Sequence, residues 1–186
     1  MLTEDYLIRR INQAIALLLH AVGLRKNGQI EAAFTDIDIA LELLIGLRSN
    51  LIKEMGDASI LQMLTVHGEL DTERLALVAD LFKEEGLLFM VEGKLPAGRQ
   101  DLLRALSFSL EVALADMAAL RPEQIASITE VGKWVNGQPL SMELQVSLFN
   151  YDQELLAKAD SVLAAGGVSR AQIESELAGL RSRLQL

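Results

Sequence analysis

The sequence AIALLLHAVGLRKNGQIEAAFTDIDIAL (residues 14–41) has the same pattern of small and large residues as ADLFKEEGLLFMVEGKLPAGRQDLLRAL (residues 79–106). Small residues at 21/86 and 33/98 allow two antiparallel helices to approach closely, and a glycine at 28/93 stands where the chain reverses. The repeat therefore predicts two helical hairpins of one design, at 14–47 and 79–112. The matched positions are Ala14, Leu17, Ala21, Leu24, Gly28, Ala33, Ile37, Ala40 and Leu41 with Ala79, Phe82, Gly86, Phe89, Gly93, Gly98, Leu102, Ala105 and Leu106.

Composition supports a helical protein. The chain has 186 residues, of which 51% are hydrophobic and only 4% aromatic, so its apolar mass comes from aliphatic side chains that suit packed helices. This length predicts a single domain, 1–186. A formal net charge of −9 argues against nucleic acid as a partner. The absence of cysteine removes disulfides and thiolate metal sites, and leaves the redox compartment open.

We expect an all-α fold in which the two hairpins pack with additional C-terminal helices at 122–184. The helices are predicted at about 4–26, 30–52, 59–66, 72–92, 97–118, 122–135, 141–165 and 170–184, with no strand. Ser59 with Gln62 and Ser169 with Gln172 fit capping boxes. Pro96 and Pro122 suit first helical turns, and Gly166-Gly167 suits a helix end.

The run Gly28-Gln29-Ile30-Glu31-Ala32-Ala33, followed by Ile37, Ala40 and Leu41, resembles the tetratricopeptide repeat, a helix-turn-helix unit of about 34 residues. The resemblance implies stacked antiparallel hairpins and a role in binding proteins. Two features depart from the repeat. The units begin at Ala14 and Ala79, much farther apart than one repeat length, so residues 48–78 must be accommodated between them, and Gly98 replaces the usual alanine.

Three further stretches resemble a bacterial protein family of unknown function with tetratricopeptide-like helices. This resemblance covers most of the chain and implies the same fold, but it implies no activity and no site residues. The stretches are Asp5-Tyr6-Leu7-Ile8-Arg9-Arg10-Ile11, Gly68-Glu69-Leu70-Asp71 and Ala165-Gly166-Gly167-Val168-Ser169-Arg170.

In a tetratricopeptide array the first helix of each hairpin lines a groove. The resemblance places Ile15, Leu18, Val22 and Lys26 there from the first hairpin, and Asp80, Lys83, Leu87 and Met90 from the second. These positions carry too few basic side chains to hold a partner's carboxylate. We expect such an apolar face to be covered by the chain's own helices 141–165 or 170–184, or by a second chain. An ordinary helical core without a groove is the alternative.

Two histidines are the candidates for acid-base chemistry near neutral pH. His20 lies in an apolar helix, where we expect a hydrogen-bonded interface or core residue. His67 begins a loop with Glu69 and Asp71 that could hold a metal or a substrate. We favour instead a solvated connector in which Asp71 or Thr72 caps the next helix.

Other polar and aromatic residues predict no chemistry. Asp36, Asp38 and Glu42, and likewise Glu84-Glu85 and Glu92, are interpreted as solvated acidic faces. For Trp134 a buried packing role is favoured over a binding anchor. No Glu-x-x-His pair, phosphate-binding loop or catalytic motif occurs, so the sequence predicts no cofactor and no resident metal.

The leading hypothesis is a non-catalytic protein–protein interaction or scaffold protein that binds a protein or peptide and can bind itself. A small-molecule or metal-dependent enzyme using the loop around His67, and a structural homo-oligomer, are the alternatives. Arg9-Arg10 before an apolar stretch is typical of a signal, but Glu4 and Asp5 precede it, and the uninterrupted run Ala14–Leu19 is too short to span a membrane. We therefore expect a cytoplasmic protein that does not bind membranes.

Overall fold

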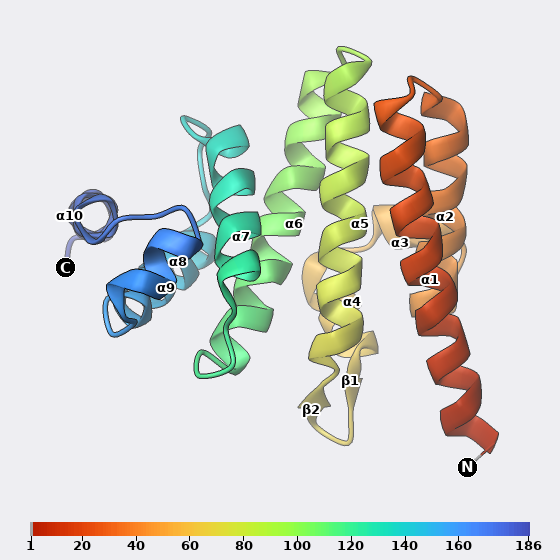
Figure 1. Cartoon of the computed structure of the whole chain (residues 1–186), viewed down its shortest axis with the longest axis horizontal. Helices are drawn as coiled ribbons and strands as arrows, with labels where there is room; N and C mark the ends of the chain where they lie inside the picture. The colour runs from red at the N-terminus through yellow and green to blue at the C-terminus, as the bar shows by residue number, and fades with distance from the viewer. Residues whose placement is uncertain (1) are drawn as a thin grey trace. The chain divides into compact units, whose positions relative to one another are not determined.

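The computed structural model describes residues 2–186, with side chains from residue 5 onward. Within this range the chain forms ten helices and one short β-hairpin, so the predicted all-α class is confirmed (Figure 1). The elements are α1 (Leu2–Lys26), α2 (Ile30–Ile45), α3 (Ser49–Glu54), α4 (Asp57–Met63), β1 (Thr65–Val66), β2 (Glu69–Leu70), α5 (Thr72–Val91), α6 (Leu95–Ala115), α7 (Pro122–Val135), α8 (Met142–Leu155), α9 (Asp160–Ala165) and α10 (Arg170–Leu184).

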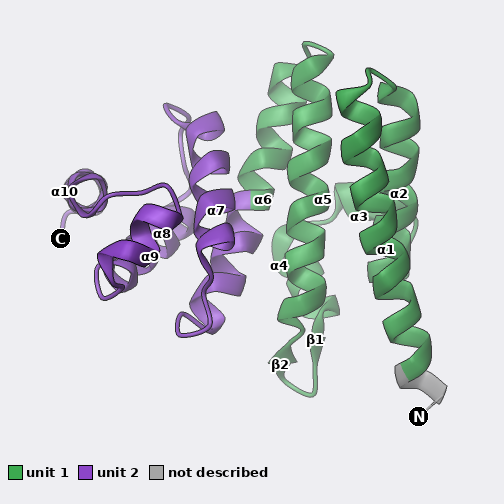
Figure 2. Ribbon diagram, in the orientation of Figure 1, with its two compact units in different colours: residues 1–105 green, residues 106–186 purple. Residues whose placement is uncertain are grey.

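The chain divides into two compact units, coloured separately in Figure 2. Unit 1 extends to Ala105 and contains α1 to α5 with the first half of α6. Unit 2 begins at Leu106 and contains the second half of α6 with α7 to α10. The prediction of one domain over 1–186 stays a prediction.

Helices α1 and α5 end in the same way, at matching positions of the repeat. At the end of α1 the amides of Gly28 and Gln29 donate to the carbonyls of Arg25 and Leu24. At the end of α5 the amides of Gly93 and Lys94 donate to the carbonyls of Met90 and Phe89. Both glycines have positive φ, 74° and 77°. This pair of bonds is the Schellman motif, which satisfies the last carbonyls of a helix and turns the chain.

In unit 1, α1 packs along α2, and α5 packs against both of them. Ala21 of α1 and Ala33 of α2 are fully buried. Across the next pair of helices, Gly86 of α5 and Gly98 of α6 lie backbone to backbone. A Cβ atom on Gly86 would be 2.8 Å from the carbonyl oxygen of Gly98. Glycine is required at this crossing because no other side chain fits.

The predicted helix 30–52 is wrong, because α2 ends at Ile45. Gly46 has φ +84° and its amide donates to the carbonyl of Glu42, which closes the helix in a left-handed cap. A separate short helix, α3, begins at Ser49, whose backbone amide donates to Glu42 Oε1 over 3.0 Å. The side chain of Glu42 therefore connects the two helices.

The predictions for residues 59–71 also need correction. Helix α4 begins at Asp57 with Gly56 as its N-cap, so Ser59 caps nothing and the predicted box with Gln62 is wrong. Strands β1 and β2, which the sequence did not predict, pair antiparallel with Val66 opposite Glu69. The two residues between them, His67 and Gly68, both have positive φ, as a type I′ turn requires.

Unit 2 has its own core, formed by regularly spaced apolar positions of α7, α8 and α10. The predicted helix 141–165 is two helices, since α8 ends at Leu155 and α9 begins at Asp160. Ser169 is the N-cap of α10, since its hydroxyl accepts from the Gln172 amide, but the predicted box is incomplete because the Gln172 side chain donates to Glu176. The predicted helix end at Gly166-Gly167 is confirmed, since Gly166 is the C-cap of α9. The buried core residues include Ile125, Ile128, Val131, Val135, Leu144, Tyr151, Leu155, Leu163, Ile173, Leu177 and Leu180.

Candidate functional site

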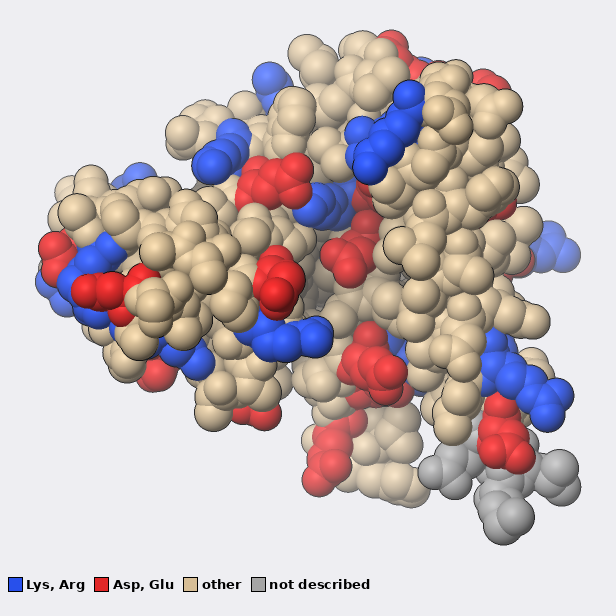
Figure 3. Space-filling view, in the orientation of Figure 1, with Lys and Arg blue, Asp and Glu red and all other residues tan. Residues whose placement is uncertain are grey.

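The groove residues predicted on α1 are partly covered. Ile15, Leu18 and Val22 are half-buried, and Lys26 is exposed. On the same helix Ile8 is 51% exposed and Leu19 is 67% exposed. No Lys, Arg, Asp or Glu occurs between Arg10 and Arg25. Figure 3 shows the resulting uncharged surface along α1.

The groove residues predicted on α5 are more mixed. Asp80 is exposed, Lys83 and Met90 are half-buried, and Leu87 is only 8% exposed. An ion pair connects α5 with α1: Arg25 Nε lies 2.5 Å from Glu84 Oε1, and Arg25 Nη2 donates to Glu84 Oε2 over 3.2 Å. The prediction that helices 141–165 or 170–184, or a second chain, cover the groove residues stays a prediction.

Helix α1 is long and apolar, yet little of it is buried. Its segment Asp5–Lys26 is long and apolar enough to cross a membrane by length and composition, and only 17% of its most apolar stretch is buried in the chain. It is the one such helix among the described residues. Core helices and N-terminal signals pass the same test of length and composition, so these properties do not assign α1 to a membrane. What they show is an apolar surface that unit 1 leaves largely uncovered.

The interpretation of Glu84-Glu85 as part of a solvated acidic face is wrong. Glu84 is 4% exposed and pairs with Arg25, while Glu85 is fully buried. The ammonium group of Lys53 lies against Glu85 and 2.6 Å from Asp38 Oδ1. Burial lowers the pKa of Lys53, but the two carboxylates raise it further, and the net shift is upward. Burial also raises the pKa of Glu85.

The repeat brings a polar pair to the same place in each hairpin. In the register that matches Ala21 with Gly86, His20 and Asp36 of the first hairpin correspond to Glu85 and Asp101 of the second. His20 Nδ1 lies 2.6 Å from Asp36 Oδ2, and His20 is exposed rather than in the core. In the second hairpin both groups are acids. Burial, and then the charge of Glu85, raise the pKa of Asp101 to about 7.

Arg104 of α6 organises the backbone next to this acidic pair. It donates to the carbonyl oxygens of Lys53 and Met55, over 3.2 and 2.8 Å, and its Nε lies 2.8 Å from Asp57 Oδ1. Its guanidinium carbon is 4.9 Å from the ring centre of Phe82. Arg104 thus attaches the segment between α3 and α4 to α6, and this role is structural.

The structure gives the polar residues of the loop around His67 separate surroundings. His67 and Glu69 are exposed, and His67 belongs to the turn of the β-hairpin. Asp71 is the N-cap of α5, since its Oδ1 accepts from the Arg74 amide over 3.0 Å, as the capping alternative predicted. In the described part of the chain no three His, Asp or Glu side chains are placed to hold a metal ion.

A pocket that the sequence analysis did not predict lies within unit 2, between α7, the segment 136–140, α8 and α10. Its volume is about 840 Å³. Apolar residues form part of its wall, among them Leu106, Ile128, Val135, Leu140, Leu148, Leu155, Val168, Ile173 and Leu180. Polar residues at the same wall are Thr129, Asn136, Gln138, Gln145, Tyr151, Asp152, Gln172, Ser175, Glu176 and Arg183.

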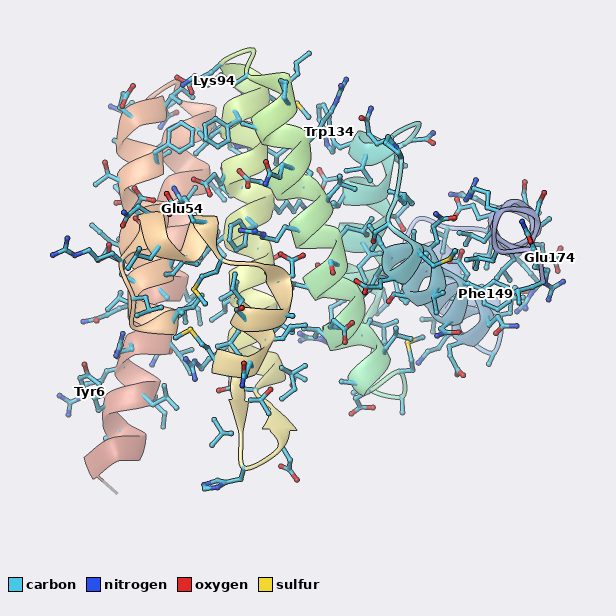
Figure 4. All side chains as sticks on the ribbon, turned by 180° about the vertical axis from the view of Figure 1, so that it is seen from behind. Tyr6, Glu54, Lys94, Trp134, Phe149 and Glu174 are labelled. Atoms are coloured by element: carbon cyan, nitrogen blue, oxygen red, sulfur yellow. The ribbon has the colours of Figure 1, made fainter. Side chains whose placement is uncertain are left out.

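Trp134 and Phe149 have different surroundings (Figure 4). Trp134 of α7 is 47% exposed, so the predicted buried packing role is wrong. Phe149 of α8 lies under the guanidinium of Arg181, whose carbon is 5.9 Å from the ring centre. This contact joins α8 to α10, and both helices line the pocket.

Comparison with protein-family models, with curated proteins and with solved structures found no match.

Proposed function

We propose that the chain is a non-catalytic protein-interaction scaffold built on two tetratricopeptide-like hairpins. The repeated register supports this architecture, because the Schellman bonds at the end of α1 recur at the matching positions of α5. The packing of α5 against both α1 and α2 also supports it, since each hairpin of a helical solenoid packs on its neighbour.

The observation that carries the proposal is a partly uncovered apolar side of α1, which we call the α1 face, with Ile8 and Leu19 exposed and Ile15 and Val22 half-buried. It consists of Ile8, Ile15, Leu19 and Val22, which lie on one side of the helix at 100° per residue. Ile8, Ile15 and Val22 follow a seven-residue spacing, which is the spacing of helices that pair along a seam. Contiguous apolar surface of this kind is rare on a monomer and marks an interaction site.

A second copy of the chain is the partner that these residues favour. Because residues 11–24 carry no Lys, Arg, Asp or Glu, two α1 faces can meet without burying an unpaired charge. Such a contact uses the same surface on both copies, which is the usual symmetry of a homodimer. The interaction is then set by shape and apolar area rather than by charge.

Light scattering over a dilution series tests this proposal. The wild type should pass from dimer to monomer as it is diluted, and Leu19→Glu should be monomeric at every concentration, because a carboxylate would be buried in the contact. Gln13→Glu is the matched control: it adds the same charge to the same helix at an exposed position outside the α1 face, and it should dimerise like the wild type.

Two outcomes would contradict the proposal. A wild type that is monomeric throughout the series, with circular dichroism showing a folded chain, would exclude the second copy as the partner. Binding of the wild type to phosphatidylcholine vesicles, abolished by Leu19→Glu and retained by Gln13→Glu, would make the α1 face a membrane-binding surface instead.

A further inference from the structure

The pocket of unit 2 has the size and wall of a ligand site. Its volume of about 840 Å³ lies within the range of pockets that hold small organic molecules. Aliphatic side chains from α7, α8 and α10 form part of the wall, which suits an apolar ligand body. The segment 136–140 is attached to α8 because Gln145 Nε2 donates to the Leu140 carbonyl over 3.0 Å.

Two polar atoms at this wall are buried without a hydrogen-bond partner. They are the hydroxyl oxygen of Tyr151, a residue only 3% exposed, and Oε1 of Gln145. Buried polar atoms are nearly always paired in folded proteins, and an unpaired one costs stability. The amide oxygen of Gln145 can only accept, so it requires a donor. A ligand that donates hydrogen bonds would supply what these atoms lack.

A buried acid follows Tyr151 in α8. Asp152 is 4% exposed and lines the pocket. Its charged neighbour at the wall is another acid, Glu176, and no Lys or Arg in the described part of the chain forms an ion pair with Asp152. Burial, and then Glu176, raise the pKa of Asp152 to about 7. Arg183, the basic residue of the pocket, is exposed.

We propose that this pocket binds a small organic cation, a primary amine with an apolar body, whose ammonium group donates to Asp152 and to the neighbouring Tyr151 hydroxyl. The aliphatic side chains of the wall take the apolar body, and the two acceptors take ammonium hydrogens. An anion is disfavoured because two acids line the pocket and its one arginine is exposed. A bare metal ion is disfavoured because it would leave the aliphatic side chains of the wall unused.

Binding of this kind is linked to pH. The ammonium group favours the ionised form of Asp152, so binding releases a proton wherever the free protein holds Asp152 protonated. The affinity for an amine should therefore rise as the pH increases from 5 to about 7 and level off above it. A neutral ligand of the same shape should show no such rise.

Isothermal titration of the whole chain with three probes of similar size tests the proposal. The probes are 2-phenylethylamine, 2-phenylethanol and phenylacetate. The amine should bind saturably, about tenfold or more tightly than the alcohol, as expected when a charge-assisted hydrogen bond is gained, and phenylacetate should not bind. Asp152→Asn should lose about tenfold or more in amine affinity and lose its pH dependence.

Two further variants keep the test decisive. Glu174→Gln changes an exposed acid of α10 that does not line the pocket (labelled in Figure 4), and it should bind the amine like the wild type. Tyr151→Phe removes only the unpartnered hydroxyl and should weaken amine binding while leaving 2-phenylethanol binding less affected. Asp152→Asn should fold at least as well as the wild type above pH 7, since it removes a buried carboxylate.

Three results would overturn the proposal: phenylacetate binding as tightly as the amine, no saturable amine binding to the folded wild type, or equal amine affinity in the wild type and Asp152→Asn. None of these measurements depends on the α1 face. Loss of the dimer in Leu19→Glu, with amine binding retained, would show that the two sites are independent.

Discussion

Gly86 and Gly98 oppose each other across α5 and α6 with no room for a side chain on either residue. A Cβ atom on Gly98 would be 2.7 Å from the carbonyl oxygen of Gly86, and one on Gly86 would be 2.8 Å from both the Gly98 carbonyl oxygen and Leu102 Cγ. The nearest atoms are backbone, which cannot move aside without shifting a helix. The same positions in the first hairpin, Ala21 and Ala33, accept a methyl group each.

Substitution of Gly86 should therefore destabilise unit 1. We expect Gly86→Ala to cost about 1–3 kcal/mol of unfolding free energy, and Gly86→Leu to cost more, because the side chain overfills the crossing. Urea unfolding followed by far-ultraviolet circular dichroism measures this change.

The control for that experiment is Gly23→Ala. Gly23 is also inside a helix, α1, but a Cβ atom there meets nothing within 4 Å. Alanine should therefore gain about 0.5–1 kcal/mol from its higher helix propensity. A cost at Gly23 equal to that at Gly86 would mean that the crossing is not the cause.

Arg104 offers a second test, because its three hydrogen-bonding contacts and its stacking on Phe82 depend on the planar guanidinium group. We expect Arg104→Lys to lose about 1–3 kcal/mol although it keeps the charge, since a lysine cannot donate to both carbonyls and stack at once. The exposed Arg48→Lys should be neutral. A melting temperature unchanged in Arg104→Lys would contradict the anchoring role.

The N-cap of α5 gives a third prediction. Asp71→Ala removes the acceptor of the Arg74 amide and should cost about 1 kcal/mol, the usual value of an N-cap. Glu69→Ala, two residues earlier and exposed, should have little effect on thermal unfolding. If both variants melt alike, the cap contributes nothing.

The helical hairpins could be predicted because their determinants are local. The register that matches the two hairpins is defined by small residues, by a glycine where the chain reverses and by apolar residues at equal spacing. The Schellman bonds at Gly28 and Gly93 follow from the same residues. The breaks at Gly46 and between α8 and α9 could not be predicted in the same way. The apolar periodicity continues across both, so the pattern does not mark where the helix ends.

The buried acids show why the polar sites were harder to predict. Glu84 and Glu85 are neighbours in a polar stretch of sequence, but both are buried, and their ion-pair partners Arg25 and Lys53 come from other helices. The unit 2 pocket depends likewise on α8 and α10 meeting at Asp152 and Glu176. No spacing in the sequence encodes such contacts, because each side chain is supplied by a separate element.

The last prediction concerns pH and the acid pair Glu85 and Asp101. The pKa of Asp101 is about 7 in the folded chain, against an ordinary value of 3.8, because burial and Glu85 disfavour its charge. The folded state therefore binds more protons than the unfolded state between these two values. The stability that protonated Asp101 contributes is therefore fully present below about pH 4 and is lost as the pH rises through about 7. The raised pKa of Glu85 acts in the same direction.

Asp101→Asn removes this dependence, so it should be more stable than the wild type by about 1–2 kcal/mol at pH 8, with a difference that shrinks towards pH 4. Urea unfolding at a series of pH values, followed by far-ultraviolet circular dichroism, measures it. As a control, the unfolding free energy of the exposed Glu69→Gln should follow that of the wild type at every pH. If the unfolding free energy of Asp101→Asn also follows the wild type, Asp101 is already ionised in the folded chain near neutral pH.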